Sequence, residues 1–198
     1  SGNVYSVYAS NGVVYSGSND DTVKAVDASD GTELWSHSLH SGNVYSVYAS
    51  NGVVYSGSFD QTVKAVDASD GSQLWSHSLH SSYIQSVHAS NGVVYSGSSD
   101  DTVKAVDATD GTELWSHSLH TNYVESVHAS NGVVYSGSSD DTVKAVDASD
   151  GTELWSHSLH SDIVSSVHAS NGVVYSGSND NTVKAVDASD GTELWSHS

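Results

Sequence analysis

The feature that most constrains the fold of this chain is its repetition. The 198 residues divide into four units of 40 residues and a fifth of 38, which lacks the Leu-His pair that closes the others. The stretch AVDASDGTELW at 25–35 returns almost unchanged at 65, 105, 145 and 185. Periods of about 20 to 50 residues are typical of solenoids, propellers and other arrays, in which each unit covers its neighbour. The expected units are 1–40, 41–80, 81–120, 121–160 and 161–198.

Each unit carries the pattern of four short strands. In the first unit the expected strands are VYSVYA (4–9), VVYSGS (13–18), TVKAVDA (22–28) and TELWSHSL (32–39). Asn11-Gly12 between the first two is the strongest hairpin signal, because both central positions of a type I′ turn need positive φ. Ser29-Asp30-Gly31 forms a further turn, and no window has a helical period that competes. The unit is therefore predicted to be a four-stranded antiparallel meander.

A single meander leaves two faces uncovered, and stacking on the next unit covers them. Four strands in 40 residues is the size of one propeller blade. We predict an all-β fold, a β-propeller of four-stranded antiparallel blades with five blades per chain, forming one domain over 1–198. The leading expectation is a monomer in which the first and last units meet. Near-identical blades specify the blade interface and not the ring size, so a larger ring made of several chains is the alternative.

The repeated stretch resembles the tryptophan-docking motif of pyrroloquinoline-quinone (PQQ) repeats. Ala25, Asp27, Gly31 and Trp35 match that motif, while Asp30 replaces its usual Thr. The resemblance implies that the Trp packs between neighbouring blades beside the Gly-containing turn, and that it does not stack a quinone or a sugar. The implied inter-blade residues are Trp35, Trp75, Trp115, Trp155, Trp195, Gly31, Gly71, Gly111, Gly151 and Gly191.

The units also resemble WD repeats. They contain Gly-Ser-x-Asp, Thr-Val, the Asp of the WD dipeptide and a His before the next strand, although Val26 stands where the WD tryptophan would be. The resemblance implies structural His-Asp pairs between His40, His80, His120 and His160 and the residues Asp60, Asp100, Asp140 and Asp180. Such a pair also suits general acid-base chemistry. Its presence in every blade, without a strained nucleophile turn, favours the structural interpretation.

Composition excludes several classes of partner. Five Lys oppose 24 acidic residues, giving a formal net charge of −19, so a phosphate backbone or an anionic membrane surface is an unexpected ligand.

From this acidic charge we infer adaptation to high salt, and we expect thermal stability to rise from dilute buffer to molar KCl. A melting temperature that does not change with salt would contradict this inference. There is no Cys, Met or Pro, no long apolar run and no leader pattern. A start in phase with the repeat and without Met suggests an excised or designed array.

Two residue sets have the chemistry of metal ligands. The adjacent pairs Asp20-Asp21, Asp100-Asp101 and Asp140-Asp141 lack the regular D-x-D-x-D-G spacing of calcium loops. His88, His128 and His168 occupy a position that is Tyr8 and Tyr48 in the first two units, and they would bind a transition metal only if they converged. We expect no metal site and no cofactor. The PQQ resemblance does not extend to catalysis, because the chain has no Cys and too few blades.

The units differ mainly at the loop that enters the first strand and at the loop between the second and third strands. In an antiparallel blade both loops emerge on the same face, so this face is the candidate surface for a ligand or partner. Its residues are Tyr5, Tyr45, Phe59, Tyr83, Gln85, Tyr123, Glu125 and Asp162. We predict a non-catalytic scaffold, not an enzyme, that binds a protein or peptide there or has no specific activity. Lectin-like or metal-dependent recognition of a small ligand on this face is the alternative.

Overall fold

The computed structural model describes residues 2–198 and shows five sheets of four antiparallel strands each. The first sheet contains β1 (Val4–Ser10), β2 (Val13–Ser18), β3 (Val23–Asp27) and β4 (Glu33–His37), and the second β5 (Val44–Ser50), β6 (Val53–Ser58), β7 (Thr62–Asp67) and β8 (Gln73–Ser78). The third contains β9 (Ile84–Ser90), β10 (Val93–Ser98), β11 (Val103–Asp107) and β12 (Glu113–His117). The fourth contains β13 (Val124–Ser130), β14 (Val133–Ser138), β15 (Val143–Asp147) and β16 (Glu153–His157), and the fifth β17 (Val164–Ser170), β18 (Val173–Ser178), β19 (Val183–Asp187) and β20 (Glu193–His197). Residues 2–198 form no helix, and hence none that could cross a membrane.

The order within each sheet is that of a simple meander, as the sequence predicts. Asn11 and Gly12 have φ of 50° and 78°, the two positive values that a type I′ hairpin needs. A bulge at Val4/Ser6 in the first strand and another at Ala25/Val26 in the third interrupt the pairing, and bulges increase the local twist of a strand. The all-β propeller with five blades per chain is confirmed.

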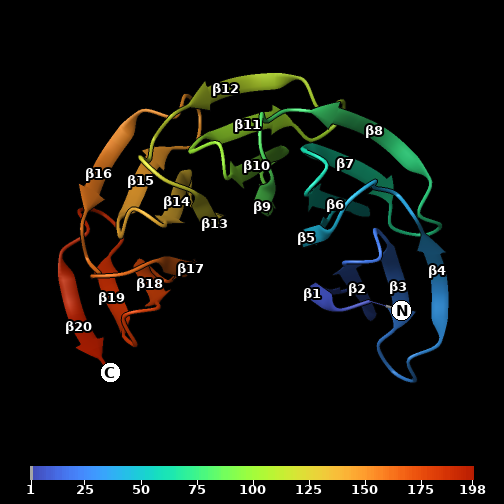
Figure 1. Ribbon diagram of the computed structural model, residues 1–198, viewed down its shortest axis with the longest axis horizontal. Helices are drawn as coiled ribbons and strands as arrows, with labels where there is room; N and C mark the ends of the chain where they lie inside the picture. The colour runs from blue at the N-terminus through green and yellow to red at the C-terminus, as the bar shows by residue number, and fades with distance from the viewer. Residues whose placement is uncertain (1) are drawn as a thin grey trace.

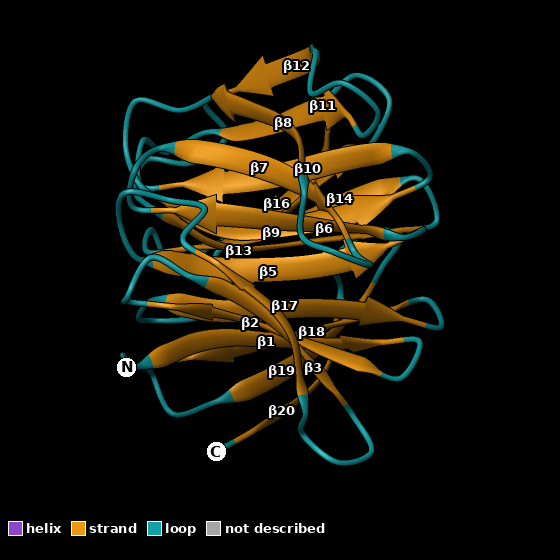
Figure 2. Cartoon of the chain, turned by 90° about the vertical axis from the view of Figure 1, so that its right-hand side faces the viewer, coloured by secondary structure: helices purple, strands orange, loops and turns teal. Residues whose placement is uncertain are grey.

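The five blades are arranged as an arc around a central space (Figure 1). The first strands of the blades, β1, β5, β9, β13 and β17, line the inside of the arc, and each packs on the next. The fourth strands, from β4 to β20, lie on the outside, and the loops gather along two opposite sides of the strands (Figure 2). Each blade thus presents one side to its predecessor and the other to its successor.

The hydrophobic core is divided into clusters that lie between successive blades. The cluster between the third and fourth blades contains Tyr95, Val103 and Trp115 from one blade and Val124 and Val146 from the next, all with 7% exposure or less. Equivalent clusters join the other neighbouring blades in residues 2–198. Burial therefore depends on the presence of a neighbour on each side.

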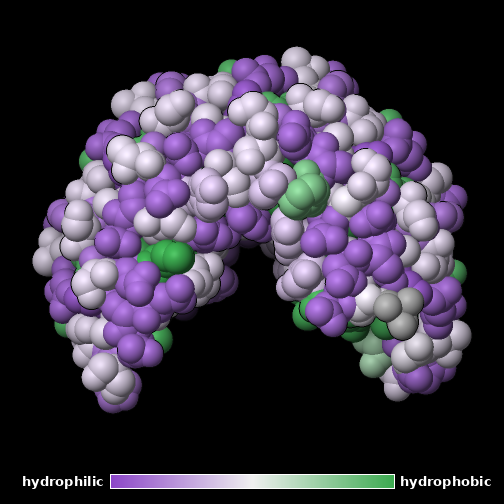
Figure 3. All heavy atoms as spheres, viewed as in Figure 1, coloured by the Kyte–Doolittle hydropathy of each residue, from purple (hydrophilic) through white to green (hydrophobic). Residues whose placement is uncertain are grey.

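The arc is open, and the expectation that the first and last blades meet is wrong. Figures 1 and 3 show a wide gap between β1 and β17. Val7 is 65% exposed, whereas Val47, its equivalent in the second blade, is 4% exposed. Trp195 is 46% exposed, whereas Trp115 is 7% exposed. The rotation between successive blades is too small for five of them to complete a ring.

The turn glycines provide a direct test of blade packing. Gly31 and Gly111 have nearly the same φ, +75° and +76°, so an Ala imposes the same backbone strain at both. A Cβ on Gly111 would overlap the rings of His77 and Trp75 in the preceding blade, whereas nothing lies within 4 Å of a Cβ on Gly31. We expect Gly111→Ala to lower the free energy of unfolding by about 1–3 kcal/mol more than Gly31→Ala, measured by urea denaturation of dilute protein. Equal losses would contradict this packing.

Candidate functional site

The repeated Trp residues lie between blades. Trp115 Nε1 donates a hydrogen bond to the carbonyl oxygen of Ala148 in the next blade at 3.0 Å, and the Tyr95 ring lies 6.0 Å away. The same bond to the next blade is made by Trp35, Trp75 and Trp155. The side chains of these four residues are enclosed and offer no ring face to a ligand. Trp195, in the last blade, is the exposed member of the set.

The repeated His residues are also held inside the protein. His80 Nδ1 lies 3.1 Å from Asp100 Oδ1, and its Nε2 lies 2.7 Å from Ser96 Oγ. The His80 side chain is completely buried. Corresponding contacts join His40 to Asp60, His120 to Asp140 and His160 to Asp180. Each His closes its unit just before the first strand of the next blade, and it fixes the incoming chain to that blade's loop between the second and third strands.

The aspartates of these pairs are stabilised in their charged form. Burial by itself would raise the pKa of Asp100, but hydrogen bonds from His80 and Thr102 outweigh it and hold the pKa well below the usual value. The backbone N–H of Ser81 also donates to the carboxylate, at 2.8 Å. Both imidazole nitrogens of His80 face side chains of the next blade, Asp100, Thr102 and Ser96, and are enclosed there. The arrangement anchors a loop and is not suited to acid-base catalysis.

The variable face carries one well-defined aromatic pair. Phe59, in the loop after β6, stacks on Tyr83 of the next blade, with ring centroids 3.9 Å apart and planes 15° apart. Both rings are exposed, Phe59 by 42% and Tyr83 by 37%. The N–H of Phe59 donates to the carbonyl of Asn43 at 2.8 Å, which joins the two variable loops of the second blade on one face.

Several other variable side chains pair with each other inside a blade. Gln85 Nε2 donates to Ser99 Oγ at 2.9 Å, and Ser139 Oγ donates to Glu125 Oε1 at 2.5 Å. The Tyr5 and Tyr45 rings lie 5.3 Å apart across the first two blades, and Tyr123 and Asp162 are exposed. Of the eight predicted variable-face residues, the structure brings Phe59 onto Tyr83 and Tyr5 beside Tyr45. Tyr5, Tyr45, Gln85 and Glu125 lie within the first strands of their blades and not in the loops. The pairing of Gln85 with Ser99 was not predicted from the sequence, although both positions differ between units.

Comparison with known proteins identifies the kind of repeat. The pattern of the PQQ-repeat family described as outer membrane protein assembly factor BamB matches residues 1–99 and 99–198. The chain belongs to this family. No curated protein is similar enough to this PQQ-repeat chain to count as a relative.

Solved structures with the same fold include two designed proteins. The computationally designed Ika8 protein has a TM-score of 0.90 and 32% identity over 98% of this chain, which spans only 61% of that protein. The computationally designed Ika4 protein has a TM-score of 0.74 and 32% identity over 79% of this chain and 98% of its own. These similarities, together with the repeats, support a designed or amplified repeat protein.

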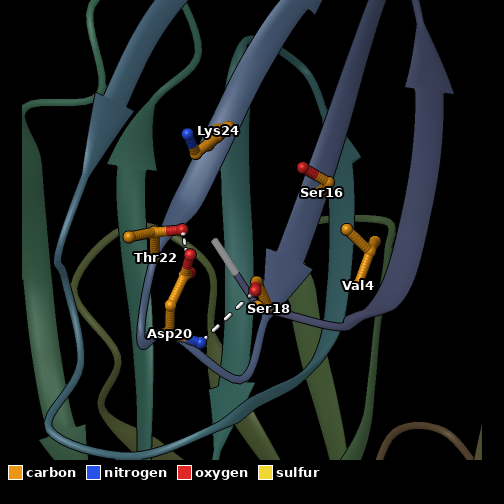
Figure 4. A pocket seen from close by; sticks show the side chains of 7 residues that line it. Val4, Ser16, Ser18, Asp20, Thr22 and Lys24 are labelled. Carbon is orange, nitrogen blue, oxygen red and sulfur yellow. Dashed lines mark hydrogen bonds between the residues drawn. The ribbon is translucent and has the colours of Figure 1, made fainter.

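The PQQ-repeat chain also has a cavity that the sequence analysis missed. About 230 Å³ of space lies in the first blade, between Gly2, Val4, Ser16, Ser18, Asp20, Thr22 and Lys24 (Figure 4). Ser16, Asp20 and Thr22 correspond to Ser96, Asp100 and Thr102, which hold His80 in the third blade. In the third blade the equivalent space is filled by His80, the last residue of the unit before it.

His88, His128 and His168, with Tyr8 and Tyr48 at the same position of the first two blades, form a stack of rings along the inside of the arc. Centroid distances are 4.3 Å for Tyr8–Tyr48, 4.2 Å for Tyr48–His88, 4.3 Å for His88–His128 and 4.4 Å for His128–His168. His88 Nδ1 accepts a hydrogen bond from the Ala129 N–H at 3.3 Å. The rings lie against one another rather than around a common point. Residues 2–198 contain no group of three or more His, Cys, Asp or Glu side chains placed to hold a metal ion.

The stack makes blade packing sensitive to acid. Burial lowers the pKa of His88 to about 3, with help from His128 and His168, and burial lowers that of His128 to about 4. The unfolded chain takes up a proton on such a His near the ordinary pKa of about 6.5, whereas the folded protein resists protonation until the pH nears the lower folded value. The free energy of unfolding is therefore highest above pH 6.5 and falls as the pH drops towards the folded pKa. Between pH 7 and pH 4 we expect His88 alone to account for a loss of about 3 kcal/mol in unfolding free energy.

The chain itself supplies the control for this prediction. Tyr occupies the same position in the first two blades and stacks in the same way, so the triple variant His88→Tyr, His128→Tyr and His168→Tyr keeps the rings but removes the titration. Urea denaturation at several pH values should show a much shallower fall for the variant between pH 6.5 and pH 4. Parallel curves for the two proteins would mean that the stack is not the acid-sensitive element.

Proposed function

We propose that this chain is a non-catalytic propeller scaffold that binds a protein or peptide on its loop face, centred on Phe59 and Tyr83. The repeat fold and the similarity to designed proteins fit a non-catalytic scaffold. The single observation that carries the finer proposal is the exposed, stacked aromatic pair, located where the blades differ from one another.

The chemistry of the pair suits protein recognition. Stacked rings lose little conformational freedom on binding, and aromatic side chains are enriched among the residues that dominate binding energy at interfaces. Tyr123, 48% exposed, adds a further aromatic residue in the next blade. With a net charge of −19 on the chain, the favoured ligand is a segment that combines apolar or aromatic anchors with Lys or Arg.

The family description supports the same class of function. An assembly factor for outer membrane proteins is named for an effect on other proteins rather than for a reaction. For this chain we take from the name only that protein ligands suit a PQQ-repeat propeller.

The experiment is selection of peptides from a displayed random library, followed by affinity measurements on variants. Phe59→Ser and Tyr83→Asn introduce residues that other units carry at these positions, Ser99 and Asn43, so the fold should be preserved. We expect each variant to weaken binding of the selected peptides at least about tenfold. Leu114→Ser, at an exposed apolar residue of the outer strand β12, should leave binding unchanged. Binding that is indifferent to Phe59 and Tyr83, or binding of glycans with one site per blade, would overturn the proposal.

A further inference from the structure

The first blade exposes a surface that is a buried contact in every later blade. Val4 and Val7 are 57% and 65% exposed, whereas Val44 and Val47 are 0% and 4% exposed. Gly31 has open space above it, whereas Gly71 lies against Trp35 and His37 of the preceding blade. This surface, formed by Val4, Val7 and the turn at Gly31, is here called the leading face.

The last blade exposes the opposite half of the same contact. Tyr175, Val183 and Trp195 are 36%, 47% and 46% exposed. Their equivalents in the third blade, Tyr95, Val103 and Trp115, are 3%, 0% and 7% exposed. The surface formed by Tyr175, Val183 and Trp195 is called the trailing face. In the four junctions inside the chain, a trailing face always packs on a leading face.

The polar groups of the junction are divided between the two ends in the same way. Inside the chain, each junction contains three bonds: a Trp Nε1 to an Ala carbonyl, a His Nε2 to an Asp carbonyl, and a Val N–H to a Ser Oγ. At the trailing face the matching groups are those of Trp195, His197 and Ser166, and at the leading face those of Ala28, Asp30 and Val7. Each donor at one end therefore has its acceptor at the other.

We propose that the 198-residue chain binds a second copy of itself head to tail, with the trailing face of one copy on the leading face of the next. The occupant is specified by the molecule, because the same contact is already made at each internal junction. It would cover the apolar residues of both faces and form the three bonds of an internal junction. The contact is heterologous, so it leaves one free face at each end of a pair.

The curvature of the arc determines what such an assembly looks like. Because this chain spans 61% of Ika8 with a TM-score of 0.90, that protein has about 320 residues, or about eight units of 40 in length. The gap in the arc therefore has room for about three blades, too few for the five blades of a second copy. In one plane a second copy would collide with the first, so the copies must either rise out of the plane of the arc as an open helical series or flatten into a closed ring of ten blades. Both assemblies use the same contact.

Sedimentation velocity over a wide concentration range tests the contact. We expect the mass to rise from the 20.7 kDa of one chain to at least twice that value. Val7→Glu disables the leading face and Trp195→Glu the trailing face, and Val183→Glu provides a second variant of the trailing face. All three residues are exposed in the single chain, so the variants should fold. Leu114→Glu, exposed on the outer strand, is the control and should associate like the parent.

Mixing the variants gives the decisive result. Val7→Glu and Trp195→Glu should each remain single chains, but a mixture should form pairs, because each variant retains the face that the other needs. The pairs should grow no further, since both outer faces carry the substitution. A parent that stays at one chain mass at all concentrations, association that is indifferent to these variants, or a mixture that does not pair would each overturn the proposal.

The cavity of the first blade carries a second, independent inference. In later blades the equivalent space is filled by a His ring, with Nε2 2.7 Å from Ser96 Oγ and Nδ1 2.9 Å from Thr102 Oγ1 in the third blade. In the second blade the backbone before the equivalent His40 is held as well, since Lys64 Nζ donates to the carbonyl of Leu39 at 2.6 Å; in the third blade Lys104 Nζ donates to Glu113 instead. Ser16 and Thr22 line the cavity with the hydroxyls that hold the His ring in later blades, and Lys24, which bonds Glu33, lies at its edge (Figure 4). The geometry points to a binding site for the imidazole ring of a peptide that ends in Leu-His.

The probe is N-acetyl-Leu-His, with free imidazole for comparison. We expect one molecule bound per chain, stronger binding of the dipeptide than of imidazole, and at least a fivefold loss of affinity in Ser16→Ala, because that substitution removes the partner of Nε2. Ser29→Ala, on the exposed turn, is the control. N-acetyl-Leu-Phe should not bind. No saturable binding, or equal affinity in Ser16→Ala, would overturn the assignment.

Discussion

Trp115→Ala is expected to lower the free energy of unfolding by about 3–5 kcal/mol. The indole is 7% exposed and fills the space between the third and fourth blades, against Val124 and Val146. Truncation leaves a cavity that the flanking sheets cannot close, and it removes the hydrogen bond to the Ala148 carbonyl. Urea denaturation monitored by circular dichroism measures the loss.

The neighbouring residue provides the matched control. Leu114 precedes Trp115 on β12 and is 51% exposed, since its side chain lies on the opposite side of the strand. Leu114→Ala should cost less than about 1 kcal/mol. If the two variants lost similar stability, the Trp would not be the main contact between blades, and the role implied by the docking motif would be incorrect.

Asp100→Ala is expected to cost about 3–5 kcal/mol, because it removes one partner of a buried pair. The carboxylate accepts hydrogen bonds from His80, from Thr102 and from the N–H of Ser81. His80 is fully buried, so without Asp100 its Nδ1 lies away from water and loses its charged partner. Thermal and urea denaturation should both show the loss.

Asp101→Asn tests whether the effect belongs to the pair or merely to charge in this loop. Asp101 has φ of 67°, a left-handed conformation that Asn tolerates well, and Asn181 occupies the equivalent position in the last blade. This substitution removes the same charge and should change stability by less than about 0.5 kcal/mol. A loss as large as that of Asp100→Ala would show that the loop, and not the His-Asp pair, carries the stability.

Local structure could be predicted closely from the sequence. The expected first strand, 4–9, is observed as Val4–Ser10, because the Asn-Gly turn fixes where the hairpin reverses. The expected fourth strand, 32–39, is shorter in the structure, Glu33–His37. The chain leaves the sheet there because His40 turns inward to bond Asp60 and Ser56 of the next blade. That competing contact lies about 20 residues away and has no local signal.

The candidate sites could be predicted only in part for the same reason. The inter-blade Trp and the His-Asp pairs came from resemblances to known repeats, whereas the ring stack depends on residues 40 positions apart. The pairing of Phe59 with Tyr83 likewise joins two blades. The cavity of the first blade corresponds to a space that His80 fills in the third blade, and this relation between units depends on contacts that a search for motifs does not detect.

The sequence by itself determined the blade: its four strands, its turns and the residues that join it to a neighbour. It did so because the two-residue alternation of side chains along each strand and the Asn-Gly turn are local properties, and they recur in all five units. Only the tertiary structure decided that five blades make an open arc. The rotation between blades is set by how side chains fit, such as Val124 against Gly97, and small shifts of this kind add up around a ring. Identical units fix the contact between blades, but the sum of their rotations decides whether the ends meet.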